Sequence, residues 1–100
     1  MKRALNDKVT HARLNKYINI TETALSSISI GSDGSSHLHR SATDVVGMVK
    51  AYLSDAKQFL EKGEYVDAFA CVNYAHGWLD AGARIGLFKV TKNRELFTID

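Results

Sequence analysis

The sequence lacks any apolar run of the roughly 18 residues that a membrane-spanning helix requires, so a membrane-spanning protein is excluded. The first 13 residues, MKRALNDKVTHAR, contain no apolar segment like that of a signal peptide, so we expect a cytoplasmic protein. The single cysteine agrees with that expectation. Cys71 falls in an apolar stretch, where a lone cysteine behaves as a small hydrophobic side chain.

Signatures of known catalytic sites are also missing. The sequence has no P-loop, no G-x-G-x-x-G after a strand, no G-x-S-x-G and no H-E-x-x-H. The sequence therefore does not indicate an enzyme, and we expect no cofactor. The histidines are spread over three segments, at positions His11, His37, His39 and His76.

The net charge is low, and the charged residues are unevenly distributed along the chain. The formal net charge of +2 is too small to indicate a nucleic-acid partner by itself. The first 16 residues are nevertheless basic, with one acidic residue, Asp7, whereas the middle of the chain is acidic. RNA binding through this N-terminal segment is therefore one alternative function. Its basic residues are Lys2, Arg3, Lys8, Arg13 and Lys16.

Hydrophobic periodicity predicts a single domain, residues 1–100, with helices at about 6–29, 42–62 and 64–88. The segment Ser41 to Asp44 resembles a capping box at the start of the second helix, and Gly63 suits a C′ position at its end. Residues 31–40, rich in glycine and serine and without proline, are expected to form a flexible loop. We expect the tail, 89–100, to pack on the helices.

The segment from Gly63 to Phe88 organises the chain. Small and apolar residues cover more than half of its helical circumference, so this helix needs partners on at least two sides. The prediction is an all-α fold, an antiparallel up-down-up three-helix bundle with the third helix central. Tyr74 and Trp78, four residues apart, are expected as a core pair, and Gly77, Gly82 and Gly86 as points of close backbone approach.

One polar strip interrupts this helix. Asn73, His76, Asp80 and Arg84 are separated by three, four and four residues, which places them on one line roughly 16 Å long. His76 is placed to pair with Asp80, and Asp80 with Arg84, an arrangement suited to binding an anion or orienting a general base. The alternative is a structural strip stabilised by side-chain pairs one turn apart.

His37 and His39 form an H-x-H pair within the expected loop. An extended segment would place both imidazoles on one side of a metal ion. Two ligands without a third fall short of a zinc site, so we predict no metal site there.

The segment Tyr74-x-x-Gly77-Trp78-Leu79-Asp80-Ala81-Gly82, preceded by YLSDAKQFL and the turn GEY, resembles an archaeal family of short proteins known as domain of unknown function 357. The resemblance covers about residues 45–88 well and the first helix loosely. It implies a small three-helix bundle in an archaeal cytoplasm and no established activity. A HEPN-type nuclease is not supported, because no arginine is followed by histidine at the expected spacing of about four to six residues.

The leading functional interpretation is a non-enzymatic module that binds another protein or self-associates through exposed parts of the third helix. The alternatives are a ligand-binding or hydrolytic site around His76, Asp80 and Arg84, and RNA binding by the N-terminal helix.

Overall fold

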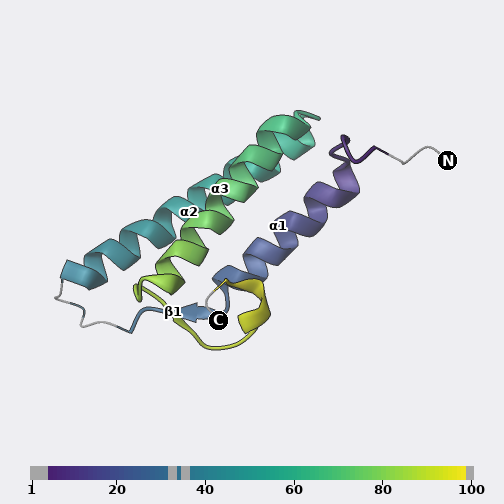
Figure 1. Cartoon of the computed structure of the whole chain (residues 1–100). Coiled ribbons are helices and arrows are strands. Elements are labelled where there is room, and N and C mark those ends of the chain that lie inside the picture. Colours follow the sequence, from purple (N-terminus) through teal and green to yellow (C-terminus); the bar gives the residue numbers. More distant parts are fainter. Residues whose placement is uncertain (1–4, 32–33, 35–36, 99–100) are drawn as a thin grey trace.

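In a computed structural model of the chain, described at residues 5–31, 34 and 37–98, three α-helices form an up-down-up bundle (Figure 1). The all-α prediction is confirmed. None of the helices in the described part of the chain has the length and hydropathy of a membrane span. The helices are α1 (His11–Leu25), α2 (His37–Glu61) and α3 (Tyr65–Arg84), followed by the 3-10 helix η1 (Arg94–Leu96), with two short strands, β1 (Ile28–Ser29) and β2 (Lys89–Val90).

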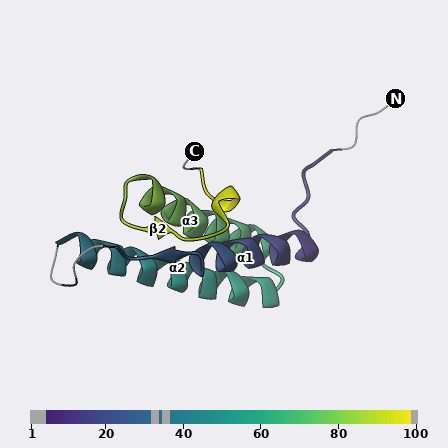
Figure 2. The same ribbon diagram turned by 90° about the horizontal axis from the view of Figure 1, so that it is seen from below.

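The core lies where α3 meets α2 and α1. α2 and α3 run antiparallel along their lengths, α1 lies beside them, and the C-terminal segment crosses above α1 and α3 (Figure 2). Each helix contributes residues at spacings of three and four, as expected for one buried face. Those buried residues include Leu14, Ile18, Thr21 and Ala24 of α1, Val45, Val49, Leu53, Ala56 and Leu60 of α2, and Ala68, Val72, Ala75 and Leu79 of α3.

α1 is shorter than predicted at both ends. Thr10 caps it, because its side-chain oxygen accepts a hydrogen bond from the Arg13 backbone N–H at 3.1 Å. At the other end, the hydroxyls of Ser26 and Ser27 both donate to the carbonyl of Thr23 at 2.7 Å. These local hydrogen bonds offer the backbone an alternative to further helix, and the chain enters β1.

The predicted start of α2 is wrong. The helix begins at His37, so Ser41 to Asp44 lie within it, and the Thr43 hydroxyl donates to the carbonyl of His39 at 2.9 Å, one turn back. His37 and His39 therefore belong to a helix, where residues two apart point about 200° away from each other. Expected loop residues 32–33 and 35–36, like Lys2, Arg3 and tail residues 99–100, lie outside the described residues.

Two glycines end α2 and α3 in the same way. Gly63 has φ 76° and Gly86 has φ 85°, a left-handed conformation that glycine adopts without steric penalty. In each case the residue after the glycine donates its N–H to a carbonyl five residues back: Glu64 to Phe59 at 2.9 Å and Leu87 to Gly82 at 2.9 Å. α3 consequently ends at Arg84 rather than near Phe88.

The tail returns to the bundle and is held there. β2 pairs antiparallel with β1, with Val90 opposite Ile28. Ser27, fully buried, accepts at its carbonyl from the N–H of Thr91 at 2.8 Å and at its hydroxyl from the Asn93 side chain at 2.9 Å. Phe88 and Phe97 are buried as well. The packed tail that the sequence predicts is thus observed, and these contacts form a clasp between the ends of α1 and α3.

Candidate functional site

His76 lies between α1 and the C-terminal segment. Its Nε2 lies 2.9 Å from the carbonyl oxygen of Leu96, and its Nδ1 lies 3.0 Å from the hydroxyl of Thr21. A carbonyl only accepts, so Nε2 carries a hydrogen and donates to Leu96. In the neutral imidazole, Nδ1 then accepts from the Thr21 hydroxyl. The ring also stacks on Phe97, with centroids 6.5 Å apart. Nε2 thus holds the tail, and Nδ1 joins α3 to α1.

Asp80 and Arg84 bind the same segment further along. Oδ1 of Asp80 accepts from the backbone N–H of Thr98 at 2.7 Å, and Oδ2 accepts from its hydroxyl at 2.8 Å. Arg84 Nη1 donates to the carbonyl of Thr98 at 2.8 Å. The three polar groups of Thr98 are therefore all bound by the strip.

The side-chain pairs expected along the strip do not form. Neither His76 with Asp80 nor Asp80 with Arg84 is an ion pair, and the ion pair found among the described residues joins Lys57 to Glu22 at 2.8 Å. His76, Asp80 and Arg84 bind the C-terminal segment instead. Asn73, the fourth residue of the strip, is exposed and lines two open pockets, one shared with His76 and one with Tyr74 and Trp78.

Tyr74 and Trp78 are not core residues, contrary to the prediction. Tyr74 is 48% exposed and Trp78 is 37% exposed. Their rings meet edge to face with centroids 6.2 Å apart, and Tyr74 meets Tyr52 of α2 at 4.7 Å. Leu79 and Ala75 face the core, and one residue along a helix turns the side chain by about 100°. The apolar arc of α3 is thus wider than the surface that α1 and α2 cover.

The uncovered part of this arc is a continuous stripe along α3. Its members are exposed, with Val66 at 78% and Ile85 at 73%, and they lie within about 120° of the helical circumference. A pocket of about 290 Å³ lies within it, lined by Tyr74, Trp78 and the small residues Gly77 and Ala81, with Asn73 at its edge. We call this surface the outer stripe: Val66, Ala70, Tyr74, Gly77, Trp78, Ala81 and Ile85.

The glycines of α3 have separate explanations. A Cβ at Gly82 would overlap the ring of Phe88, so Gly82 admits the returning tail, not another backbone. Gly86 ends the helix. A Cβ at Gly77 would meet nothing within 4 Å. Nothing within the described chain therefore requires glycine at position 77, although glycine inside a helix is less stable than alanine by about 0.5–1 kcal/mol.

A protein family matches most of this chain. Its sequence model, described as a protein of unknown function (DUF357), matches residues 16–88. The chain belongs to the DUF357 family. The match confirms the resemblance seen in the sequence, and it includes the outer stripe and all four strip residues. The tail residues that bind the strip, Leu96 and Thr98, follow the matched region of DUF357. No curated protein and no solved structure matches the chain.

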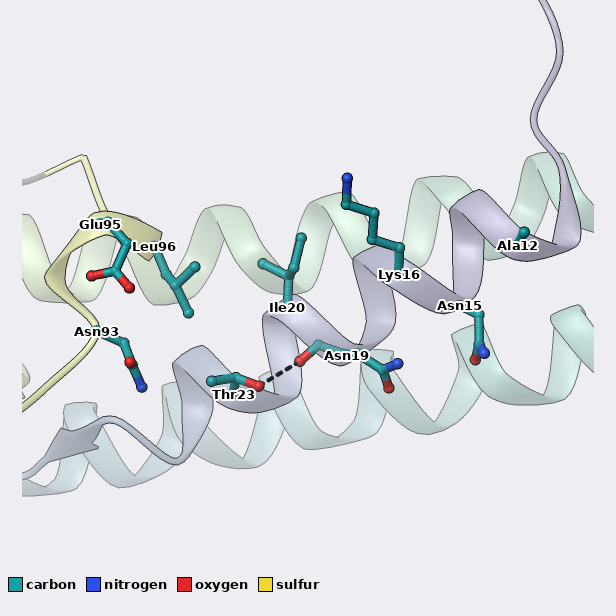
Figure 3. A pocket seen from close by; sticks show the side chains of 9 residues that line it. All are labelled: Ala12, Asn15, Lys16, Asn19, Ile20, Thr23, Asn93, Glu95 and Leu96. Carbon is teal, nitrogen blue, oxygen red and sulfur yellow. Dashed lines mark hydrogen bonds between the residues drawn. The ribbon is translucent and has the colours of Figure 1, made fainter.

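A shallow groove runs along the outside of α1 in this DUF357 chain (Figure 3). It has a volume of about 600 Å³ and lies between the exposed face of α1 and the tail. Of the basic residues nearby, Lys16 lines it, whereas the Arg13 guanidinium is held by the Asn6 side chain at 2.7 Å. Six of its nine lining residues are polar. The lining residues are Ala12, Asn15, Lys16, Asn19, Ile20, Thr23, Asn93, Glu95 and Leu96.

Metal and thiol chemistry find little support in the described residues. They contain no group of three histidine, cysteine or acidic side chains that could hold a metal ion. Cys71 is half-buried on α3. Burial, reinforced by the negative charges of Asp55 and Asp67, raises the pKa of its thiol. A raised pKa disfavours the thiolate, which is the nucleophilic form. Cys71 therefore suits the role of a small apolar side chain.

Proposed function

We propose that this DUF357 protein is a non-enzymatic interaction module that binds a protein helix through the outer stripe of α3. One observation carries the proposal: an apolar stripe that includes Trp78 and Tyr74 runs the length of α3, and its residues are exposed although Tyr74 also meets Tyr52 of α2. Contiguous apolar surface of this kind marks interaction sites, and aromatic residues are enriched at their centres. The cytoplasmic location expected from the sequence is part of the proposal.

The shape of the stripe favours a helix as the bound element. It is about 28 Å long, from Val66 to Ile85, and only about one third of the helical circumference wide. A second helix laid along it would bury one side chain on every turn. The small side chains at Ala70, Gly77 and Ala81 leave hollows between the larger ones, as ridge-into-groove packing requires.

The other two interpretations have weaker support. A ligand-binding or hydrolytic role for His76, Asp80 and Arg84 would require the tail to leave, because it takes up their polar groups. RNA binding would draw on the basic residues around the start of α1, among them Lys8, Arg13 and Lys16; Arg13 keeps its charge although its guanidinium donates to the Asn6 side chain. A gel shift at low salt that is lost in Lys16→Glu would favour RNA over the interaction module.

Photocrosslinking tests the proposed surface. A benzoylphenylalanine residue replaces Ala81 in the stripe or, as the matched control, Ala51, which is exposed on α2 outside the stripe. In extract of the native host, we expect protein adducts from position 81 and few from position 51. Ala70→Glu, on the same stripe three turns away, should reduce those adducts at least tenfold, because binding would bury an unpaired charge. Equal labelling from both positions, or adducts that Ala70→Glu leaves intact, would contradict the proposal.

A further inference from the structure

Six of the seven members of the outer stripe, all except Trp78, are spaced symmetrically along the helix. They follow one another at intervals of four, four, three, four and four residues, a pattern that is the same in both directions. The midpoint lies between Ala75 and His76. The six positions are Val66, Ala70, Tyr74, Gly77, Ala81 and Ile85.

We propose, building on the interaction surface above, that the occupant of the outer stripe is a second copy of this chain, packed antiparallel across a two-fold axis. Two antiparallel copies of one helix place each residue level with the residue equally far beyond the midpoint. Tyr74 then lies level with Gly77 of the other copy, Ala70 with its Ala81, and Val66 with its Ile85. These six apolar positions meet one another, whereas Trp78 lies level with Asn73 of the other copy.

Side-chain size also favours this register. The largest side chain of the symmetric set, Tyr74, lies level with the smallest, Gly77, and alanine lies level with alanine. Gly77 borders the pocket of about 290 Å³ that an aromatic ring from the other copy can enter. Because a Cβ at Gly77 meets nothing within its own chain, close approach of a second chain supplies the missing reason for glycine at this position.

Charge separates the antiparallel arrangement from the parallel one. Asp67 and Arg84 are exposed at opposite ends of α3, equally far from the midpoint. In a parallel pair in register, Asp67 would lie beside Asp67 and Arg84 beside Arg84, with Tyr74 against Tyr74. The antiparallel pair brings opposite charges to the same level and avoids both repulsions.

The size of the contact sets the expected affinity. One helix pair of this length falls in the lower class of interfaces, below about 1,200 Å² in total, which is typical of reversible complexes. We therefore expect a dimer with a dissociation constant on the order of micromolar. Sedimentation equilibrium across that range should show a transition from monomer to dimer.

Cysteine pairing tests the register. In a Cys71→Ser background, Ala70→Cys and Ala81→Cys chains are prepared separately, one of them labelled with ¹⁵N, then mixed and oxidised. The antiparallel register places positions 70 and 81 of different copies together, so the mixed disulfide should dominate. In the same register, Ala70 of one copy lies about 16 Å along the axis from Ala70 of the other, beyond the reach of a disulfide. Intact mass distinguishes the products.

Each outcome decides the inference. Two results together support the antiparallel dimer. The mixed disulfide dominates, and the dissociation constant of the dimer rises at least tenfold in Gly77→Ala but stays unchanged in Gly47→Ala. Gly47 is the matched control, since it is exposed in α2 and a Cβ there also meets nothing. Disulfides of Ala70→Cys with itself would overturn the antiparallel register. A protein that stays monomeric while position 81 crosslinks to a different protein would overturn the dimer and leave the proposed function standing.

Discussion

Replacing Gly77 by alanine should stabilise the monomer. Gly77 lies in the interior of α3, it is exposed, and a Cβ there has open space around it. Alanine is favoured over glycine inside a helix by about 0.5–1 kcal/mol, and no clash offsets that gain. For a chain of this size, this corresponds to a rise in melting temperature of about 2–8 °C. The measurement is thermal and urea unfolding followed by circular dichroism, at dilutions where sedimentation gives the monomer mass.

Gly82→Ala supplies the contrast. A Cβ at position 82 would overlap the Phe88 ring, which must then leave its buried site or distort its surroundings. Overpacking of this kind costs about 1–3 kcal/mol, which equals or exceeds the gain in helix propensity. We therefore expect Gly77→Ala and Gly47→Ala to be more stable than the natural sequence, and Gly82→Ala to be less stable. A loss of stability in Gly77→Ala would show that the side of α3 described as open is in fact occupied, and the outer stripe would lose its basis.

Three further predictions concern the tail and the thiol. His76→Phe removes both hydrogen bonds of the ring and leaves the Thr21 hydroxyl, which is 2% exposed, without its partner, so urea unfolding should show a loss of about 1–3 kcal/mol. Asp80→Ala should accelerate amide hydrogen exchange at Thr98 while Val72 in the core stays protected; unchanged exchange at Thr98 would contradict the Asp80 contact. Because the pKa of its thiol is raised, Cys71 should react with iodoacetamide more slowly than free cysteine near pH 8. At alkaline pH, where the rate of free cysteine has levelled off, the rate of Cys71 should still increase. Asp67→Asn should speed the reaction of Cys71, because it removes a negative charge that raises the pKa.

The bundle itself could be predicted from the sequence because it depends on periodicity. Leu14, Ile18 and Thr21 in α1 and Val45 and Val49 in α2 recur at helical spacing, and all are buried. That information is local, and it suffices for helices that pack along one face.

Positions that depend on distant segments were harder to predict. Trp78 and Leu79 are adjacent in the sequence and both apolar. Only the placement of α1 and α2 determines that Leu79 is buried and Trp78 is not. The strip residue His76 was identified, but its partners Thr21 and Leu96 lie 55 and 20 residues away. Asn93 gave no sequence signal beyond a polar residue in the tail, although its positive φ and its bond to Ser27 help to anchor that tail.

The clasp between Ser27 and Thr91 joins residues 64 positions apart, and this separation has a consequence for folding order. The entropy lost on closing a loop grows with its length, so the α2–α3 hairpin, with its four-residue spacing between Glu61 and Tyr65, should form early and the clasp late. In the reverse direction, the C-terminal segment should detach before the helices separate. Such a partly opened species would present His76, Asp80 and Arg84 to solvent while the core residues of the three helices are still packed together.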